Sequence, residues 1–226
     1  MAQPILRPPG NLLVLVGPAG AGKTTLAHRL IDAAPERRGF SVSHTTRPIR
    51  STETDHLDYH FVSRGEFEAL RAVGGFVESA EVHGNLYGTS RAEVERKTAD
   101  GSDLIFDIDI EGAQNLARAF PARTRLFFVL PPGWDVLVAR LEGRGSETPA
   151  TLGRRLRTAR AELEALLASA LSWHLLCNDD IDATATALDA AVSGPWPPER
   201  RARDWQLAEA FAAAARQDLR TAPEAP

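Results

Sequence analysis

The sequence predicts an α/β fold in which helices cover a mostly parallel sheet, with a small α+β insertion. Short apolar runs alternate with segments of helical periodicity along most of the chain, as in βαβ units. Between residues 41 and 93 the pattern changes to alternating strands, a short helix and glycine turns. The 226 residues are enough for one sizeable core with small inserted lobes.

Four short apolar runs are expected to form buried strands: Asn11–Gly17, Leu104–Ile110, Thr124–Leu130 and His174–Asp180. The first and the third are each followed by a pattern typical of a helix. The stretch RGSETPATLGRRLRTARAELEALLASAL begins with turn residues and continues as a long, arginine-bearing helix. Further on, prolines break the chain at Pro195, Pro197 and Pro198. An amphipathic helix is then predicted from the helical spacing of Trp205, Ala208, Phe211, Ala212 and Ala215.

The composition of the chain limits which partners it binds and in which cellular compartment it is expected. The formal net charge is -4, so no basic excess favours nucleic acid or an anionic membrane surface as a partner. The single cysteine, Cys177, excludes an intramolecular disulfide. The N-terminal residues lack the apolar core of a signal peptide, and no apolar run approaches the ~18 residues that span a bilayer. We therefore expect a cytoplasmic protein.

The segment GPAGAGKT, Gly17–Thr24, fits the phosphate-binding pattern G-x-x-x-x-G-K-[ST] at every fixed position. Its glycines let backbone N–H groups point at phosphate oxygens, Lys23 adds positive charge, and the Thr24 hydroxyl can ligate Mg²⁺. A predicted strand precedes it and a predicted helix follows, which a merely glycine-rich turn would not explain. The ATP phosphates are therefore expected at Gly17, Pro18, Ala19, Gly20, Ala21, Gly22, Lys23, Thr24 and Thr25. The pattern alone does not identify the reaction.

A second anion site is predicted in SVSHTTRPIR, which runs from Ser41 to Arg50. Arg47 and Arg50 lie among four hydroxyl residues, and guanidinium groups match phosphate geometry bidentately. Such a site suits a phosphorylated acceptor. From this segment alone, a solvated turn with surface arginines is an equally good interpretation.

The ordered motifs TTRPIR, ETDHLDYHFVS, FVESAEVHGNLYGTS and DIDIEGA together resemble guanylate kinase, over roughly Leu12 to Leu188. The resemblance implies a P-loop kinase fold with an inserted GMP-binding lobe and a helical lid. It implies in-line transfer of the ATP γ-phosphoryl group to GMP, with ATP and GMP as partners and Mg²⁺ as cofactor. The expected domain is 11–193, made of a core (11–40, 94–135 and 157–193), a GMP-binding lobe (41–93) and a lid (136–156). An extension, 194–226, follows, with a helix over 199–218 and a disordered end, TAPEAP.

The resemblance also implies roles for individual side chains. The GMP phosphate is expected at Arg47, Arg50, Tyr59 and Tyr87, and the guanine at Ser43, Glu78, Thr89 and Asp109. A carboxylate such as Glu78 can accept hydrogen bonds from guanine N1–H and its 2-amino group, whereas adenine has no N1–H. The lid arginines, Arg140, Arg144 and Arg155, are expected to act on the transferred phosphoryl group together with Lys23 and Arg47. Asp107 is expected to order the Mg²⁺ water shell, and Asn178 to lie near the adenine.

The sequence departs from the family pattern at three positions. Thr52 and His56 stand where glycines are usual, which puts the geometry of that loop in question. Glu111 stands where glutamine is usual and adds negative charge near Asp107 and Asp109. Two alternatives remain open: a catalytically inactive guanylate-kinase-like binding module, and a kinase for another phosphorylated acceptor such as ribose 1,5-bisphosphate. A homo-oligomer also remains open.

Overall fold

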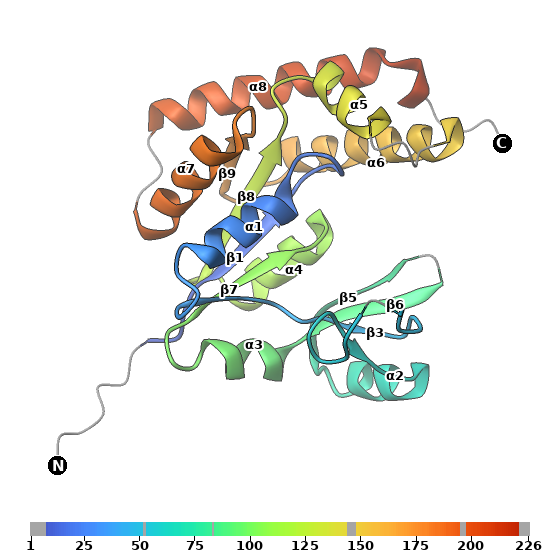
Figure 1. Ribbon diagram of the computed structural model, residues 1–226, viewed down its shortest axis with the longest axis vertical. Helices are drawn as coiled ribbons and strands as arrows, with labels where there is room; N and C mark the ends of the chain where they lie inside the picture. The colour runs from blue at the N-terminus through green and yellow to red at the C-terminus, as the bar shows by residue number, and fades with distance from the viewer. Residues whose placement is uncertain (1–7, 52, 83, 144–147, 195–197, 222–226) are drawn as a thin grey trace. The chain divides into compact units, whose positions relative to one another are not determined.

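The computed structural model describes residues 8–51, 53–82, 84–143, 148–194 and 198–221 (Figure 1). A five-stranded parallel sheet has the strand order β2-β7-β1-β8-β9. Its strands are β1 (Leu12–Val16), β2 (Arg38–Phe40), β7 (Asp103–Asp107), β8 (Thr124–Leu130) and β9 (Trp173–Cys177). This arrangement confirms the predicted α/β class.

Two of the four predicted strands end three residues earlier than expected. The run that starts at Leu104 leaves the sheet after Asp107, because Ile110 begins helix α4 (Ile110–Ala119). Its apolar residues buried at helical spacing are Ala113 and Leu116. The last strand ends at Cys177, because the Asp180 side chain accepts a hydrogen bond from Ala183 N and caps helix α7 (Ile181–Ser193).

The residue contacts divide the chain into two compact units. Unit 1 comprises Met1–Leu13, Ala34–Phe106 and Glu111–Thr124, and unit 2 comprises Val14–Ala33, Asp107–Ile110 and Arg125–Pro226. Within unit 1, β2 pairs with β7 in parallel, and within unit 2, β8 pairs with β9 in parallel. The apolar residues of β1, β7 and β8 supply much of the buried core.

Unit 1 also contains a separate four-stranded sheet of order β4-β3-β6-β5. Its strands are β3 (His44–Thr45), β4 (His60–Phe61), β5 (Phe76–Val82) and β6 (Asn85–Ser90). Helix α2 (Arg64–Ala72) begins with a capping box between Ser63 and Glu66 and stacks Phe67 on Phe76. Helix α3 (Arg91–Thr98) follows β6. This sheet accounts for the change of pattern that the sequence shows between residues 41 and 93.

Unit 2 holds α1 (Lys23–Asp32), α5 (Trp134–Glu142), α6 (Pro149–Leu167), α7, α8 (Pro198–Gln217) and a 3₁₀ turn, η1 (Leu219–Thr221). In Figure 1, α8 runs beside α5 and α6, which it contacts. Its buried positions are Asp204, Ala208, Phe211, Ala212 and Ala215. Four of the five predicted positions are therefore buried. At the fifth, Trp205 is half-buried and the preceding residue, Asp204, is buried instead. Thr221, expected in a disordered end, is 4% exposed in η1; the other five residues of TAPEAP lie outside the described residues.

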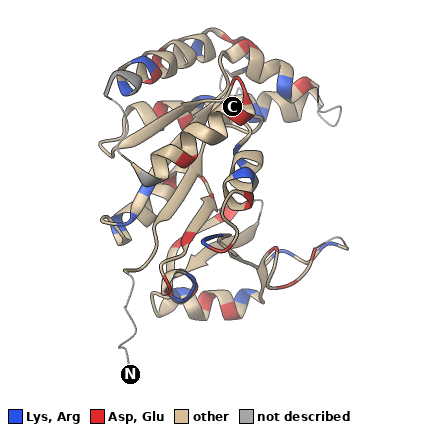
Figure 2. Ribbon diagram, turned by 60° about the vertical axis from the view of Figure 1, so that its left-hand side comes forward, with Lys and Arg blue, Asp and Glu red and all other residues tan. Residues whose placement is uncertain are grey.

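Charged residues of both signs are interspersed along the described chain (Figure 2). Among the helices described, none combines the length and apolar character needed to cross a bilayer.

Candidate active site

The phosphate-binding loop connects β1 to α1 in unit 2. Gly17, Gly20 and Gly22 all have positive φ, at 139°, 91° and 95°, in the region that favours glycine. Gly22 is the N-cap of α1 and makes no side-chain capping bond. The backbone N–H groups at this helix N-terminus are therefore the natural ligands of an anion, as the motif predicts.

Lys23, Thr24 and Asp107 meet beside this loop. Lys23 Nζ donates to the carbonyl of Gly17 at 2.7 Å and lies 3.8 Å from Asp107 Oδ1. The Thr24 hydroxyl donates to Asp107 Oδ2 at 2.9 Å. The pairing joins residues 83 positions apart, and it brings a hydroxyl and a carboxylate together where the sequence predicted a Mg²⁺ site.

Asn178 closes the other side of the loop. Its side-chain amide donates to the carbonyl of Ala21 at 2.7 Å, and a Cβ at Gly22 would clash with the same amide. The backbone carbonyl of Asn178 in turn accepts a hydrogen bond from Arg140 Nη2 at 3.0 Å. Asn178 is 4% exposed. It therefore holds the loop backbone and Arg140 together, a role that its predicted place near the adenine did not include.

The structure describes a position in the fold for each of the other predicted residues of this unit except Arg144. Arg155 lies on α6 and is half-buried, while Arg144 lies outside the described residues. Asp109 belongs to unit 2 with Asp107, whereas the other three residues predicted to bind guanine belong to unit 1. Thr25 is exposed in the first turn of α1.

Glu162 of α6 is a titratable group of this site that was not predicted from the sequence. Burial raises the pKa of its carboxyl to about 7, Lys23 opposes the rise, and Asp109 and Asp107 add to it. Its Oε2 atom is buried without a hydrogen bond among the described residues. In the sequence, Glu162 is one of several acidic residues on a long helix, and no local pattern singles it out.

The predicted acceptor-phosphate residues gather in unit 1 around Glu53. This carboxylate accepts hydrogen bonds from Arg47 Nη1 at 3.0 Å and Nη2 at 2.7 Å, and from the backbone N–H of Arg50 at 2.8 Å. The hydrogen bond to Arg47 lowers the pKa of Glu53 and raises the pKa of Arg47. In the sequence, Glu53 could be recognised by its position, six residues after Arg47 and three after Arg50.

Tyr59 and Tyr87 complete this cluster. Their rings meet edge to face with centroids 5.9 Å apart, and the Arg47 guanidinium lies 5.5 Å from the centre of the Tyr59 ring. Burial raises the pKa of the Tyr59 hydroxyl. Arg50 is 70% exposed, with Nη1 3.9 Å from Glu53. The four predicted phosphate ligands are thus together, with Arg47 fixed and Arg50 extended into solvent.

The predicted guanine residues Ser43, Thr89 and Glu78 form a hydrogen-bonded chain. The Thr89 hydroxyl donates to Glu78 Oε1 at 2.6 Å, and Ser43 Oγ lies 3.3 Å from Thr89 Oγ1. Strand pairing sets this arrangement, because β5 and β6 place Glu78 opposite Thr89 just after a register shift. Thr89 is fully buried. The pairing of β5 with β6 makes Glu78 and Thr89 neighbours, and their role at guanine stays a prediction.

The departures from the family pattern have different outcomes. Among the described residues His56 is the one non-glycine with positive φ, 65°, so it takes the conformation expected of the glycine that it replaces. Its ring nitrogen Nδ1 lies 2.7 Å from His60 Nδ1. Glu111 is in the first turn of α4, where the helix dipole favours a carboxylate. Thr52 lies outside the described residues.

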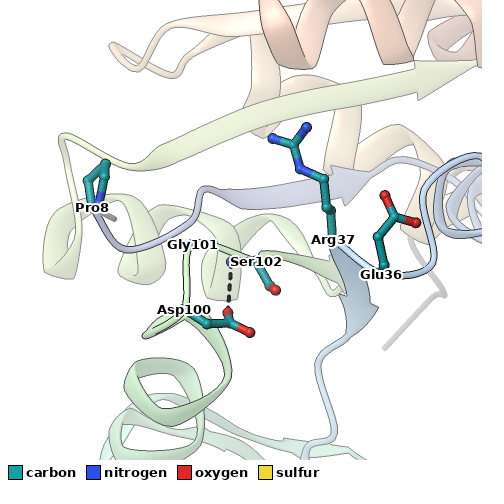
Figure 3. A pocket seen from close by; sticks show the side chains of 6 residues that line it. All are labelled: Pro8, Glu36, Arg37, Asp100, Gly101 and Ser102. Carbon is teal, nitrogen blue, oxygen red and sulfur yellow. Dashed lines mark hydrogen bonds between the residues drawn. The ribbon is translucent and has the colours of Figure 1, made fainter. Parts of the chain in front are cut away.

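A cavity of about 470 Å³ lies elsewhere in unit 1 (Figure 3). One guanidinium and two carboxylates line it, and none of the predicted nucleotide ligands does. Its lining residues are Pro8, Glu36, Arg37, Asp100, Gly101 and Ser102.

Known proteins of one family resemble this chain in sequence and in fold. A family model described as guanylate kinase matches residues 9–194. The chain is 44% identical over 200 residues to the guanylate kinase of Anaeromyxobacter dehalogenans, covering 85% of this chain and 87% of that protein. It is 42% identical over 192 residues to the guanylate kinase of a Chelativorans species, covering 83% and 84%. The crystal structure of guanylate kinase from Anaplasma phagocytophilum is similar, with a TM-score of 0.61, 30% identity and 88% of each chain covered.

Proposed function

This chain belongs to the guanylate kinase family and phosphorylates GMP with ATP, and we propose that the two residue clusters described above bind these two substrates. The cluster in unit 2 binds the ATP phosphates, and the cluster in unit 1 binds GMP. The observation that carries the assignment is the hydrogen-bonded chain Ser43–Thr89–Glu78, because it presents guanine-specific chemistry next to the phosphate cluster of the same unit.

Glu78 selects guanine over adenine in this proposal. A carboxylate offers about four lone-pair positions, so accepting from Thr89 leaves capacity for guanine N1–H and the 2-amino group. The Thr89 bond fixes the orientation of the carboxylate before the base arrives. AMP offers no N1–H, so the Glu78 oxygens that it covers would lose water without gaining a donor, which is costly. Ser43, on the far side of Thr89, would face the base as well, and Asp109 remains a predicted guanine ligand.

Arg47 and Arg50 bind the GMP phosphate in different ways. Glu53 holds the Arg47 guanidinium in one orientation, so little side-chain entropy is lost when a phosphate arrives. Arg50 is exposed and can turn toward the same phosphate. Tyr59 and Tyr87 add hydroxyl donors. This division explains why two arginines coexist with a carboxylate that neutralises part of their charge.

The P-loop binds the ATP phosphates through its backbone N–H groups and Lys23. Lys23 donates to the loop carbonyls of Gly17 and Pro18, and we expect it to exchange these bonds for the β- and γ-phosphates. Arg140, Arg155 and the undescribed Arg144 add positive charge around the transferred group.

Thr24 and Asp107 fit a magnesium ion. A hydroxyl oxygen and a carboxylate oxygen 2.9 Å apart, beside a phosphate-binding loop, are hard donors of the type that Mg²⁺ prefers. Thr24 would bind the ion directly and Asp107 through water. When bound, Mg²⁺ neutralises charge on the nucleotide phosphates.

The phosphoryl transfer requires no strong general base from the protein. The attacking oxygen belongs to the GMP phosphate, which is already ionised at pH 7, and it displaces ADP from the γ-phosphorus in line. Catalysis is therefore positioning plus stabilisation of charge by Lys23 and the arginines. A cytoplasmic location remains a prediction from the sequence, which leaves the oligomeric state open.

The test is a coupled ADP-release assay with ATP and Mg²⁺ and with GMP, AMP, CMP, UMP, ribose 1,5-bisphosphate or no acceptor. Turnover with GMP well above every other acceptor supports the assignment of the Glu78 cluster to guanine. Comparable turnover with AMP would remove that assignment, whereas a Glu78→Ala variant with unaltered GMP kinetics would remove Glu78 alone.

A further inference from the structure

The C-terminal residues of the chain lie beyond the family match, which ends at residue 194, yet they make specific contacts with helix α5. We use the name C-terminal clasp for Asp218, which directly follows α8, and for Arg220 and Thr221, which lie in η1. Figure 1 shows this end of the chain beside α5 and α6. All of these elements belong to unit 2.

The clasp contacts the first residue of α5. Trp134 Nε1 donates to Asp218 Oδ2 at 2.9 Å, and the Trp134 side chain packs edge to face on Phe211 of α8 with ring centroids 5.5 Å apart. Trp134 is 7% exposed. A buried indole N–H needs a hydrogen-bond acceptor, and Asp218 provides a charged one.

The clasp also contacts the last residue of α5. Arg220 Nη1 donates to Glu142 Oε1 at 3.3 Å. The same guanidinium is fixed by Asp218, through Nε to Oδ1 at 2.9 Å and Nη2 to Oδ2 at 2.7 Å. These bonds to Arg220, followed by the bond from Trp134, lower the pKa of Asp218 to about 2. Asp218 thus binds Trp134 directly and orients Arg220, which binds Glu142 at the other end of α5.

Thr221 joins the clasp to α6. Its hydroxyl donates to the Ala215 carbonyl at 2.7 Å and accepts from Arg160 Nη1 at 3.4 Å. Thr221 is buried, so the clasp is anchored on α8 and α6 rather than lying loosely on the surface.

Helix α5 needs such contacts because its own local interactions stabilise it only weakly. It has nine residues, and its N-cap, Gly133, provides no side-chain hydrogen bond. A helix this short is marginal in isolation, so tertiary contacts must fix its position. It carries Arg140 close to its C-terminal end, and Arg140 is bonded to Asn178, which holds the P-loop at Ala21.

We propose that the C-terminal clasp is a positioning element for Arg140. By fixing both ends of α5, it holds the guanidinium in register with the P-loop, where the charge of the transferred phosphoryl group develops. The proposal rests on the role of Arg140 proposed above. Asp218 and Arg220 are positioning residues, since neither is placed in contact with a substrate.

The test is a double-mutant cycle between Asp218→Ala and Arg140→Ala, with kcat and the KM values for GMP and ATP measured for each purified variant. Asp218→Ala is expected to lower kcat about tenfold while KM for GMP changes less than twofold. In the Arg140→Ala background it should lower kcat no further, because the side chain that it positions is absent. Arg201→Ala is the matched control, since Arg201 of the same extension donates to Ser172 and not to α5.

Several outcomes would overturn the proposal. They are additive losses of kcat in the double variant, an unchanged kcat in Asp218→Ala, and an unchanged kcat in Arg140→Ala. A loss that only follows the unfolded fraction, measured by circular dichroism in the same samples, would also overturn it. If Asp218→Ala does not fold, Arg220→Ala takes its place in the same cycle. If the wild-type chain did not phosphorylate GMP, the result would contradict the enzyme activity itself and not the positioning role of the clasp.

Discussion

Glu53 accepts two hydrogen bonds from the guanidinium of Arg47, at 3.0 and 2.7 Å, and one from the backbone of Arg50. A carboxylate therefore organises the cluster of Arg47 and Arg50, although the GMP phosphate that we propose as its ligand is itself an anion. The pair is an orienting device: one arginine is held in place while the other remains exposed.

Glu53→Ala is expected to raise KM for GMP about tenfold, because Arg47 and the Arg50 backbone lose the group that orients them. KM for ATP should change little, since the P-loop has its own contacts. Steady-state kinetics with each substrate varied in turn measures both values. A lower KM for GMP would mean instead that Glu53 mainly competes with the phosphate.

Glu78→Ala should reduce the preference for GMP over AMP, expressed as a ratio of kcat/KM, by roughly 10²-fold or more. The physical reason is the loss of the acceptor for guanine N1–H and the 2-amino group. Glu81→Ala is the matched control, because Glu81 lies on the same strand but pairs with Arg64 at 3.5 Å. Equal preference in wild type and Glu78→Ala would contradict the guanine assignment.

Gly22→Ala is expected to destabilise the P-loop and to abolish measurable ATP binding. A Cβ at this position would clash with the Asn178 amide, and a φ of 95° costs a non-glycine residue about 1–2 kcal/mol. Urea unfolding and ATP titration give the two readouts. Gly39→Ala in β2 is the control, since nothing lies within 4 Å of its added Cβ. Equal effects of the two substitutions would refute the steric account.

The histidines of the small sheet should make stability depend on pH. Burial lowers the pKa of His44 to about 4. The nearby His60 and His56 add to this shift, whereas Glu93 opposes it. An unfolded histidine titrates near 6.5, so the folded state favours the neutral form. The stability present above pH ~6.5 is therefore lost as the pH falls toward 4.

The measurement is the urea midpoint at pH 7.5, 6 and 5 for wild type and His44→Gln. The variant should show a shallower loss of stability over this range. His28→Gln, which changes an exposed histidine of α1, should retain the wild-type slope. Parallel curves for His44→Gln and wild type would exclude His44 as a source of the pH dependence.

Local sequence patterns determined the elements whose structure depends on neighbours along the chain. The P-loop glycines take the positive φ that their motif implies, and the apolar run at Thr124–Leu130 forms the strand that was predicted. For both, the information lies within a few residues. His56 is an exception, because the loop keeps a glycine-like conformation although histidine itself does not favour one.

Tertiary structure alone decided which distant side chains became partners. Trp134 and Asp218 are 84 positions apart, and no period or motif links them. The burial of Asp204 in place of Trp205 likewise depends on the surfaces that α8 covers. Hydrogen bonds and burial act through space, whereas a sequence pattern records only spacing along the chain. The sequence by itself therefore determined the family and the P-loop, while the nucleotide ligands stay predictions. The packing of α8 decided that the C-terminal residues contact α5.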